Sequence, residues 1–220
     1  MMDRQINHKT MRLIIGLIAV LLAPMVMLLA NAEQPLTSIS ISYWTDAQDI
    51  FVGSLVAVGF FLSAYNGRSE TIDWEFCLSK AACVFAIVVA LFPTDGFSNK
   101  DIPPAWISTV SKIFRLEPTQ IHYSAAVLLF VCLIAMIWFF PNRAACKGKP
   151  IRALIYRVIA CSMVIGIVGI FILGELIFDW DNTVLLIEFF GLTLFGAGWF
   201  LAGTYKTENG QSYKKEAVQT

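Results

Sequence analysis

Long apolar runs alternate with short polar segments along the whole chain. At about 1.5 Å of rise per residue, a helix of roughly 20 apolar residues crosses the ~30 Å hydrocarbon core of a bilayer. The pattern predicts six such helices, over residues 11–30, 49–65, 76–92, 121–140, 153–174 and 183–203. We therefore expect an all-α membrane bundle over residues 11–203, between a short polar segment, 1–10, and a polar, disordered tail, 204–220.

The last run contains a single carboxylate, Glu188. At helical spacing it shares one face with Gly191, Phe195, Gly198 and Ala202, and Gly196 and Gly203 lie on a neighbouring stripe. Small residues let another helix approach closely, and a carboxylate in hydrocarbon normally faces protein or water. We predict that this face points inward, and that the glycine-rich stripes would also suit an oligomer.

Two polar segments have internal patterns. In the first, 33–48, Ser38, Ser40 and Ser42 alternate with isoleucines, which predicts a short extended segment. In the second, 94–120, apolar residues recur at helical spacing after Asp101 and a Pro-Pro pair. This predicts a short amphipathic helix, which either lies on the membrane surface or packs against the bundle.

The first apolar run has two interpretations. A basic flank, an apolar run and the small residues Ala30-Asn31-Ala32 are also found in a signal peptide cleaved after Ala32. The apolar run of a signal peptide is only about 7 to 15 residues long, so a retained helix is favoured. The sequence leaves cleavage open.

Basic residues predict the orientation of the bundle. All Lys and Arg residues except Lys100, Lys112 and Arg115 fall on one side if both termini are placed in the cytoplasm. Positively charged segments stay inside, so this arrangement satisfies the positive-inside rule. We expect a multi-pass protein of the cell membrane, in a bacterial inner membrane, with both ends cytoplasmic.

Composition excludes several classes of protein. The net charge is zero, so the charge gives no indication of a nucleic-acid partner. A hydrophobic fraction of 57% leaves no room for an ordinary soluble domain. The five cysteines have no metal-ligand spacing, and the two histidines, His8 and His122, lie on opposite sides of the predicted membrane. We therefore predict no metal site, and the sequence names no cofactor; its expected environment is the lipid bilayer.

A set of polar residues gathers at the predicted outer ends of the helices. We interpret five of them as lining one outward-facing ligand pocket: Asp46, Asp49, Asp95, His122 and Glu188. Glu188 is either a proton site, counter-ion or base, with His122 or Arg157 as partner, or a structural carboxyl bonded to a Ser, Tyr or Trp. Asp46 and Asp49 either hold a cation or cap a helix.

The sequence also resembles a group of uncharacterised bacterial six-helix membrane proteins. The resemblance rests on five blocks: SISYWTDAQDIFVGSLVAVGFFLSAYNG, ALFPT at 90–94, IHYSAA from Ile121, RALIYRV at 152–158 and IEFFGLTLFGAGWFLAG of the last run. It implies the fold and the membrane location, and no activity. DRAM-like proteins are loosely similar in helix number. Alkaline ceramidases and adipoQ receptors are more distantly similar, but they bind zinc with three histidines, which this chain does not provide.

Three functions follow as hypotheses. The first is binding of a small or lipidic ligand in the outer pocket without catalysis, as a sensor, accessory subunit or structural component. The second is hydrolysis of lipid headgroups, with His122 or Glu188 as base. The third is proton-coupled transport, in which Glu188 carries the proton.

Overall fold

The computed structural model describes residues 8–32, 34–65, 74–97 and 101–204, and these residues form helices and turns without any strand. The helices are α1 (His8–Leu29), α2 (Gln48–Ser63), α3 (Trp74–Leu91), α4 (Ala105–Phe114), α5 (Pro118–Cys146), α6 (Pro150–Phe171) and α7 (Thr183–Gly203). A 3₁₀ turn, η1 (Ser40–Trp44), precedes α2, and a π-helical segment, η2 (Ile172–Phe178), continues α6. The all-α prediction is confirmed. The basic residues Arg4 and Arg68 and nearly all of the predicted tail, 205–220, lie outside these ranges.

Five helices are long and apolar enough to cross a membrane: α1, α3, α5, α6 with η2, and α7. This indicates a multi-pass membrane protein. The helix α2 is apolar but has only 16 residues.

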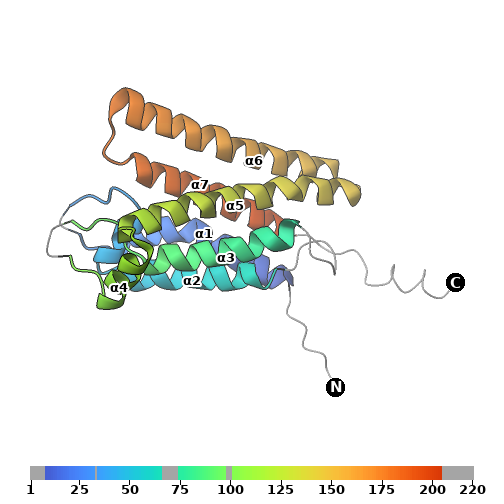
Figure 1. Ribbon diagram of the computed structural model, residues 1–220. Helices are drawn as coiled ribbons and strands as arrows, with labels where there is room; N and C mark the ends of the chain where they lie inside the picture. The colour runs from blue at the N-terminus through green and yellow to red at the C-terminus, as the bar shows by residue number, and fades with distance from the viewer. Residues whose placement is uncertain (1–7, 33, 66–73, 98–100, 205–220) are drawn as a thin grey trace, which may run out of the picture.

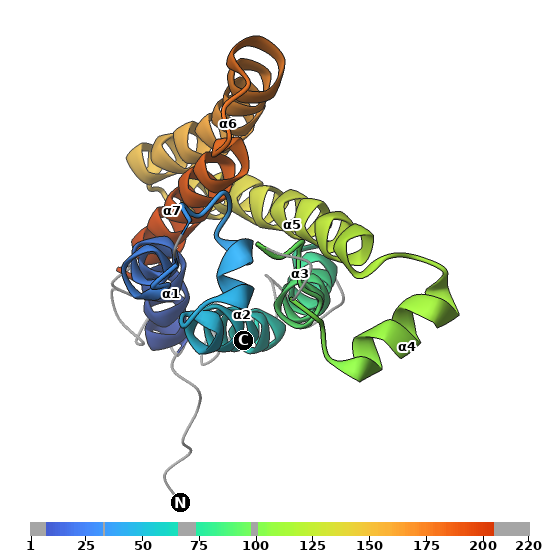
Figure 2. The same ribbon diagram turned by 90° about the vertical axis from the view of Figure 1, so that its left-hand side faces the viewer.

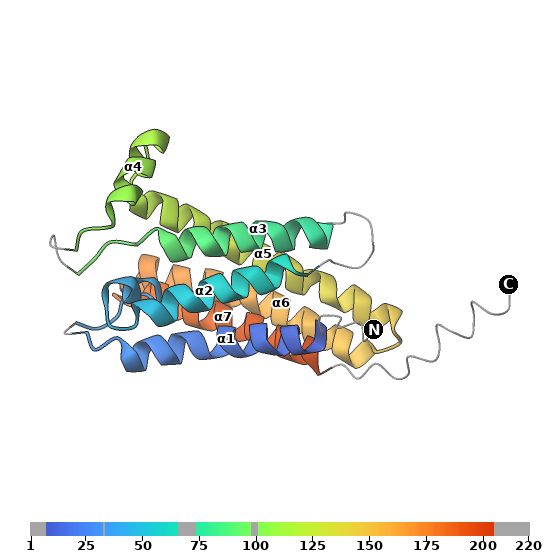
Figure 3. The ribbon, with the colours of Figure 1, turned by 90° about the horizontal axis from the view of Figure 1, so that it is seen from below.

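All the long helices and α2 run roughly along one direction, α4 lies across it, and α1 begins at the same end of the bundle at which α7 ends (Figures 1 and 3). Viewed along the bundle, α1, α2, α3, α5 and α7 surround η1, while α6 lies on the outside beside α7 (Figure 2). The short η1 therefore closes one end of the ring from within. We call this the η1 end, and the end where α5 meets α6 the basic end.

Glycines set the closest helix contact, between α1 and α7. A Cβ atom added to Gly16 would lie 2.8 Å from the backbone oxygen of Gly196, and one added to Gly196 would lie 2.8 Å from the backbone oxygen of Gly16. Neither position has room for a side chain, because the two backbones touch. On the predicted inward face of α7, Gly191 packs against Phe130 and Gly198 against Ile137, both on α5. Glu188 and Phe195 on this face are also buried, so the predicted orientation is confirmed.

Two predicted helix boundaries and one predicted conformation are wrong. The helix α5 does not end before Pro141 but continues to Cys146, since a buried membrane helix tolerates an internal proline when neighbouring groups satisfy the freed backbone. The helix predicted over residues 153–174 does not end at residue 174, because η2 extends it to Phe178. The serine-rich segment is not extended: Ser42 donates from its backbone N–H and its hydroxyl to the Ile39 carbonyl, and such local bonds favour a 3₁₀ turn.

The predicted amphipathic helix is present as α4 and begins after Pro104. Its Ile107 is buried, and the Trp106 ring packs edge-on against Phe92 at the end of α3, with 5.7 Å between ring centroids. Ile113 and Phe114 are exposed. One side of α4 therefore packs against the bundle and its C-terminal turn carries exposed apolar side chains.

Candidate functional site

Glu188 lies in the second turn of α7 and is 9% exposed. The backbone N–H of Ile39 donates to its Oε2, and the Ser40 hydroxyl donates to its Oε1 at 2.7 Å. The N–H of Leu185 donates to the Thr37 carbonyl at 2.9 Å, which fastens the same two segments a second time. The start of η1 is therefore clamped onto the start of α7, and Glu188 receives both of its described hydrogen bonds from uncharged groups.

The rest of η1 is anchored by apolar burial and by one polar chain. Ile39, Ile41 and Tyr43 are buried. The indole N–H of Trp44 donates to the Thr94 carbonyl at 2.9 Å, and the Thr94 hydroxyl lies 2.8 Å from the hydroxyl of Tyr123. The 3₁₀ turn is thus connected to α7 on one side and to the end of α3 and the start of α5 on the other.

Two small cavities lie in the interior of the bundle below η1. The first has a volume of about 30 Å³ and is lined by Glu188, Ser40, Ile39 and apolar side chains that include Phe51 and Leu192. The second, of about 20 Å³, is lined by apolar residues and Ser54. A single water needs roughly 10–15 Å³, so each cavity holds one or two waters at most. Among the described residues that line them, Glu188 is the only ionisable one.

The five predicted ligand residues lie at or near helix ends: Asp46 and Asp49 at the start of α2, Asp95 after α3, and His122 and Glu188 near the starts of α5 and α7. His122, 1% exposed, places Nδ1 2.6 Å from the Phe92 carbonyl. Asp46, Asp49 and Asp95 are exposed. The described contacts contain no hydrogen bond or ion pair between any two of the five, so the structure gathers them at one end without joining them. Their role as one pocket stays a prediction.

Two expected interactions are corrected. Glu188 does not pair with His122 or Arg157; its described partners are the Ile39 N–H and the Ser40 hydroxyl, so a bond to a serine is present, and the choice between a functional and a structural carboxyl stays a prediction. Asp46 and Asp49 do not cap α2 through their side chains: the N-cap residue is Ala47, and Asp46 accepts a bond from the Asn31 amide at 3.1 Å. The local bond at this helix start runs from the Ala47 N–H to the Thr45 hydroxyl, at 3.1 Å.

Within the described residues, no group of three or more His, Cys, Asp or Glu side chains is arranged to hold a metal ion. The chemistry that the site offers is that of one buried carboxylate between the η1 segment and an apolar cavity. Such a group can accept hydrogen bonds, exchange a proton or pair with a ligand that carries a donor.

Residues 14–182 match a family described as "Protein of unknown function (DUF998)". The chain belongs to the DUF998 family. The resemblance to an uncharacterised group of membrane proteins is thereby confirmed. No curated protein and no solved structure matches this chain.

The matched region of this DUF998 protein includes η1 and ends just before α7. Ser40 and the backbone of Ile39 therefore lie inside the family region, whereas Glu188 lies outside it. Sequence reasoning did not identify Ser40 as the partner of Glu188. The available signal was the run of serines in a polar segment near apolar helices, and it was interpreted as an extended segment.

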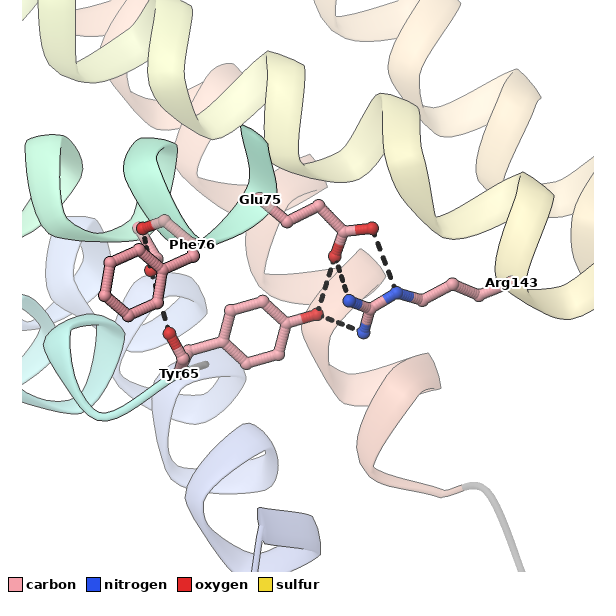
Figure 4. A network of polar contacts seen from close by, with 5 residues as sticks. Tyr65, Glu75, Phe76 and Arg143 are labelled. Atoms are coloured by element: carbon pink, nitrogen blue, oxygen red, sulfur yellow. Dashed lines mark hydrogen bonds and ion pairs between the residues drawn. The ribbon is translucent and has the colours of Figure 1, made fainter. Parts of the chain in front are cut away.

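The sequence patterns also did not predict a second polar cluster, which lies at the basic end (Figure 4). Glu75, 7% exposed, forms an ion pair with Arg143, whose Nε donates to Glu75 Oε1 at 3.0 Å. The Tyr65 hydroxyl donates to Glu75 Oε2 at 3.1 Å and accepts a bond from Arg143. Ser79 donates to the Tyr65 carbonyl at 2.9 Å. Glu75 and Arg143 are 68 positions apart, so no local pattern in the sequence indicates this contact.

Proposed function

We propose that this protein spans the membrane six times, with both ends in the cytoplasm, and binds a small or lipidic ligand at its η1 end without catalysing a reaction. In this proposal α2 is the shortest span, residues 11–203 form the membrane domain, and the η1 end faces outward from a bacterial inner membrane. The distribution of basic residues supports this orientation, because Arg12, Lys80 and Arg143 all lie near the basic end.

One observation supports ligand binding above the others. The Glu188 carboxylate is buried, borders an apolar cavity of about 30 Å³, and is held only by neutral donors from a short 3₁₀ turn. A ligand with an apolar body and one amine or hydroxyl group matches this environment, since its donor would replace the Ile39 N–H and the Ser40 hydroxyl. The cavity is too small for such a ligand while η1 is in place. Binding would therefore displace η1, which suits a sensor.

The exposed aspartates would form the polar entrance in this proposal. Asp46 borders a surface pocket of about 310 Å³ that Asn31, Trp44 and Phe97 also line. The Trp44 side chain contributes to this pocket and also bonds the Thr94 carbonyl next to Asp95. A ligand that enters here contacts one end of η1 before it reaches Glu188 at the other.

The test is native mass spectrometry of protein purified in mild detergent. The variants are Glu188→Gln and, as the matched control, Glu175→Gln, which makes the same change at an exposed carboxylate on η2. We expect a bound small molecule or lipid on the wild type and on Glu175→Gln, and its loss on Glu188→Gln. An adduct retained equally by all three proteins, or absent from the wild type, contradicts the proposal. Lipid turnover that Glu188→Gln abolishes would contradict the absence of catalysis.

A proton-coupled carrier is the second candidate, favoured because Glu188 is the one ionisable side chain among the described residues that line the two interior cavities. In a carrier, protonation of Glu188 would weaken its bonds to η1 and open the end of the bundle. Flux of a solute into proteoliposomes would then depend on pH in the wild type and lose this dependence in Glu188→Gln. Flux with the same pH dependence in both proteins would exclude this role for Glu188.

A further inference from the structure

The helix α4 lies at the η1 end, across the direction of the long helices and outside the ring that they form (Figures 1 and 2). The bundle covers only part of it. Ile107 is buried and the Trp106 ring packs against Phe92, whereas Ile113 and Phe114 are 71% and 65% exposed. The ligand site proposed around Glu188 does not account for this exposed apolar turn.

The covered and the exposed apolar residues of α4 belong to one helical face. Ile107, Val110 and Phe114 follow one another at spacings of three and four residues. Along this face Ile107 is buried, Val110 is half-buried and Phe114 is exposed. The opposite face carries Ser108 and Lys112, which are exposed. An apolar face and a polar face on a helix that lies across the spans are typical of a helix at a membrane interface.

The contact with α3 shows which way the apolar face points. Trp106 meets Phe92 directly after the end of α3, so this face is turned toward the bundle. The end of a spanning helix marks the boundary between hydrocarbon and headgroups. The uncovered part of the face, at Phe114, is therefore turned toward the acyl chains beside the bundle. It continues the exposed apolar surface of α5, where Val127 and Val131 are located.

A groove of about 450 Å³ lies between α4 and the start of α5. Its described lining includes Ser108, Ser111, Lys112 and Arg115, with one carboxylate, that of Glu117. The Glu117 side chain already caps α5, where it accepts a backbone N–H. The Ser111 hydroxyl oxygen is buried and has no hydrogen-bond partner. Hydroxyl, ammonium and guanidinium groups all donate hydrogen bonds, so the groove suits a ligand rich in acceptor oxygens.

A lipid surface fits α4 better than a second copy of the chain does. A stable protein interface needs roughly 20–30 residues on each side. The exposed apolar turn offers only Ile113, Phe114 and Leu116. Fluid acyl chains need no matching surface and can cover three side chains at a helix end.

We propose that α4 binds the surface of an anionic phospholipid leaflet, with Ile113 and Phe114 among the acyl chains and Lys112 and Arg115 on headgroup phosphates. The long side chains of Lys and Arg can follow an apolar surface while their charged ends reach the headgroups. A phosphate accepts several charge-assisted hydrogen bonds at once. This inference depends on the membrane-spanning helices. It depends neither on a ligand at Glu188 nor on the side of the membrane that the η1 end faces.

The experiment is photocrosslinking of the full chain in nanodiscs made from an equal mixture of phosphatidylglycerol and phosphatidylcholine. The photoreactive residue p-benzoylphenylalanine replaces Phe114 in one protein and Ala105 in the matched control. Ala105 is an exposed position of the same helix and shares the face of Ser108 and Lys112. A third protein carries the photoreactive residue at Val131, an exposed position within the α5 span, as the lipid-facing reference.

We expect lipid adducts at Phe114 and Val131, and a yield at least several-fold lower at Ala105. A crosslink from Phe114 to a second copy, seen as a doubled mass, overturns the proposal. So does a lipid yield at Phe114 as low as that at Ala105. High and equal yields at both positions also overturn it, because α4 would then be surrounded by lipid and not lie at its surface.

The headgroup contacts are tested by the phosphatidylglycerol fraction among the lipids attached at Phe114. We expect an enrichment over the bulk mixture on the order of fivefold for each basic residue, and its loss in the double variant Lys112→Gln, Arg115→Gln. Arg157→Gln changes an exposed arginine of α6 and should keep the enrichment. The same lipid fraction in the wild type and in the double variant overturns the assignment of Lys112 and Arg115 to headgroup phosphates.

Discussion

Glu188 and Glu75 are buried to nearly the same extent, 9% and 7% exposed, at opposite ends of one bundle, and their surroundings differ in charge. Glu188 is held by a backbone N–H and a hydroxyl on the short turn η1, whereas Glu75 is held by the Arg143 guanidinium and the Tyr65 hydroxyl. Moving η1 away from Glu188 exposes two neutral groups to solvent or ligand. Moving Arg143 away from Glu75 separates a buried ion pair, which is far more costly.

This difference assigns different roles to the two carboxylates. The basic end is fastened by a charged contact that links α3 to α5, so it suits a fixed support. The η1 end is closed by neutral, replaceable hydrogen bonds, so it suits a place that opens. Four substitutions test this comparison, from the largest expected effect to the smallest.

Glu75→Ala should have the largest effect. It leaves Arg143 buried without its counter-ion, and breaking a buried pair costs about 3–5 kcal/mol of stability. Denaturant unfolding in detergent measures the change in the free energy of unfolding. Glu175→Ala, at an exposed carboxylate, is the control and should change it by less than about 0.5 kcal/mol. A similar small change for both variants would show that the pair does not fasten the bundle.

Glu188→Ala should come second, with a loss of about 2 kcal/mol, because the Ile39 N–H and the Ser40 hydroxyl lose their acceptor. Glu188→Gln should lose less, since an amide oxygen still accepts one bond. Hydrogen exchange over residues 37–44 should rise in Glu188→Ala, and exchange near Glu75 should not. Unchanged exchange in η1 would contradict the clamp between η1 and α7.

Ser40→Ala should cost about 1 kcal/mol, the usual contribution of one hydrogen bond. In a double-mutant cycle with Glu188→Ala the two losses should not add, because both variants remove the same bond. Ser124→Ala, at an exposed position of α5, is the control. Additive losses for Ser40 and Glu188 would show that the two side chains do not interact.

Lys147→Gln should have the smallest effect and the opposite sign. The pKa of Lys147 is lowered in the folded protein, so its charged form is disfavoured there, and the thermal midpoint of the variant should equal or slightly exceed that of the wild type near neutral pH. Stability linked to Lys147 is present above its unfolded pKa, about 10.4, and is lost as pH falls through the folded pKa. The difference between the proteins should therefore shrink as pH rises from about 7 towards 10. A thermal midpoint that is clearly lower in the variant would contradict the conclusion that the folded protein disfavours the charged form of Lys147.

The expectations that were correct depend on short stretches of the chain. The apolar runs, the amphipathic helix at α4 and the inward face of α7 follow from length and helical periodicity alone. The boundary errors occurred where neighbouring elements override local preference. A proline normally ends a helix, yet Pro141 is buried inside α5 against the rest of the bundle, and the polar serine segment coils because its hydroxyls and N–H groups bond within η1.

The candidate site could also be predicted only in part from the sequence. Glu188 could be selected from the sequence because a carboxylate inside an apolar run is energetically exceptional. Its partners could not, because Ser40 is 148 positions away and reaches Glu188 only when the first loop enters the ring of helices. Glu75 and Arg143 each look like an ordinary charge at a helix end until α3 and α5 are packed together.

The sequence by itself therefore determined that this chain forms apolar helices of membrane-spanning length with an acidic group on the inner face of the last one. These properties depend on composition and periodicity, which act over neighbouring residues. Only the tertiary structure decided which neutral groups close over Glu188 and which cation pairs with Glu75. Each of these depends on contacts between distant segments, and burial makes the contacts strong because it removes the water that would otherwise compete for the same polar groups.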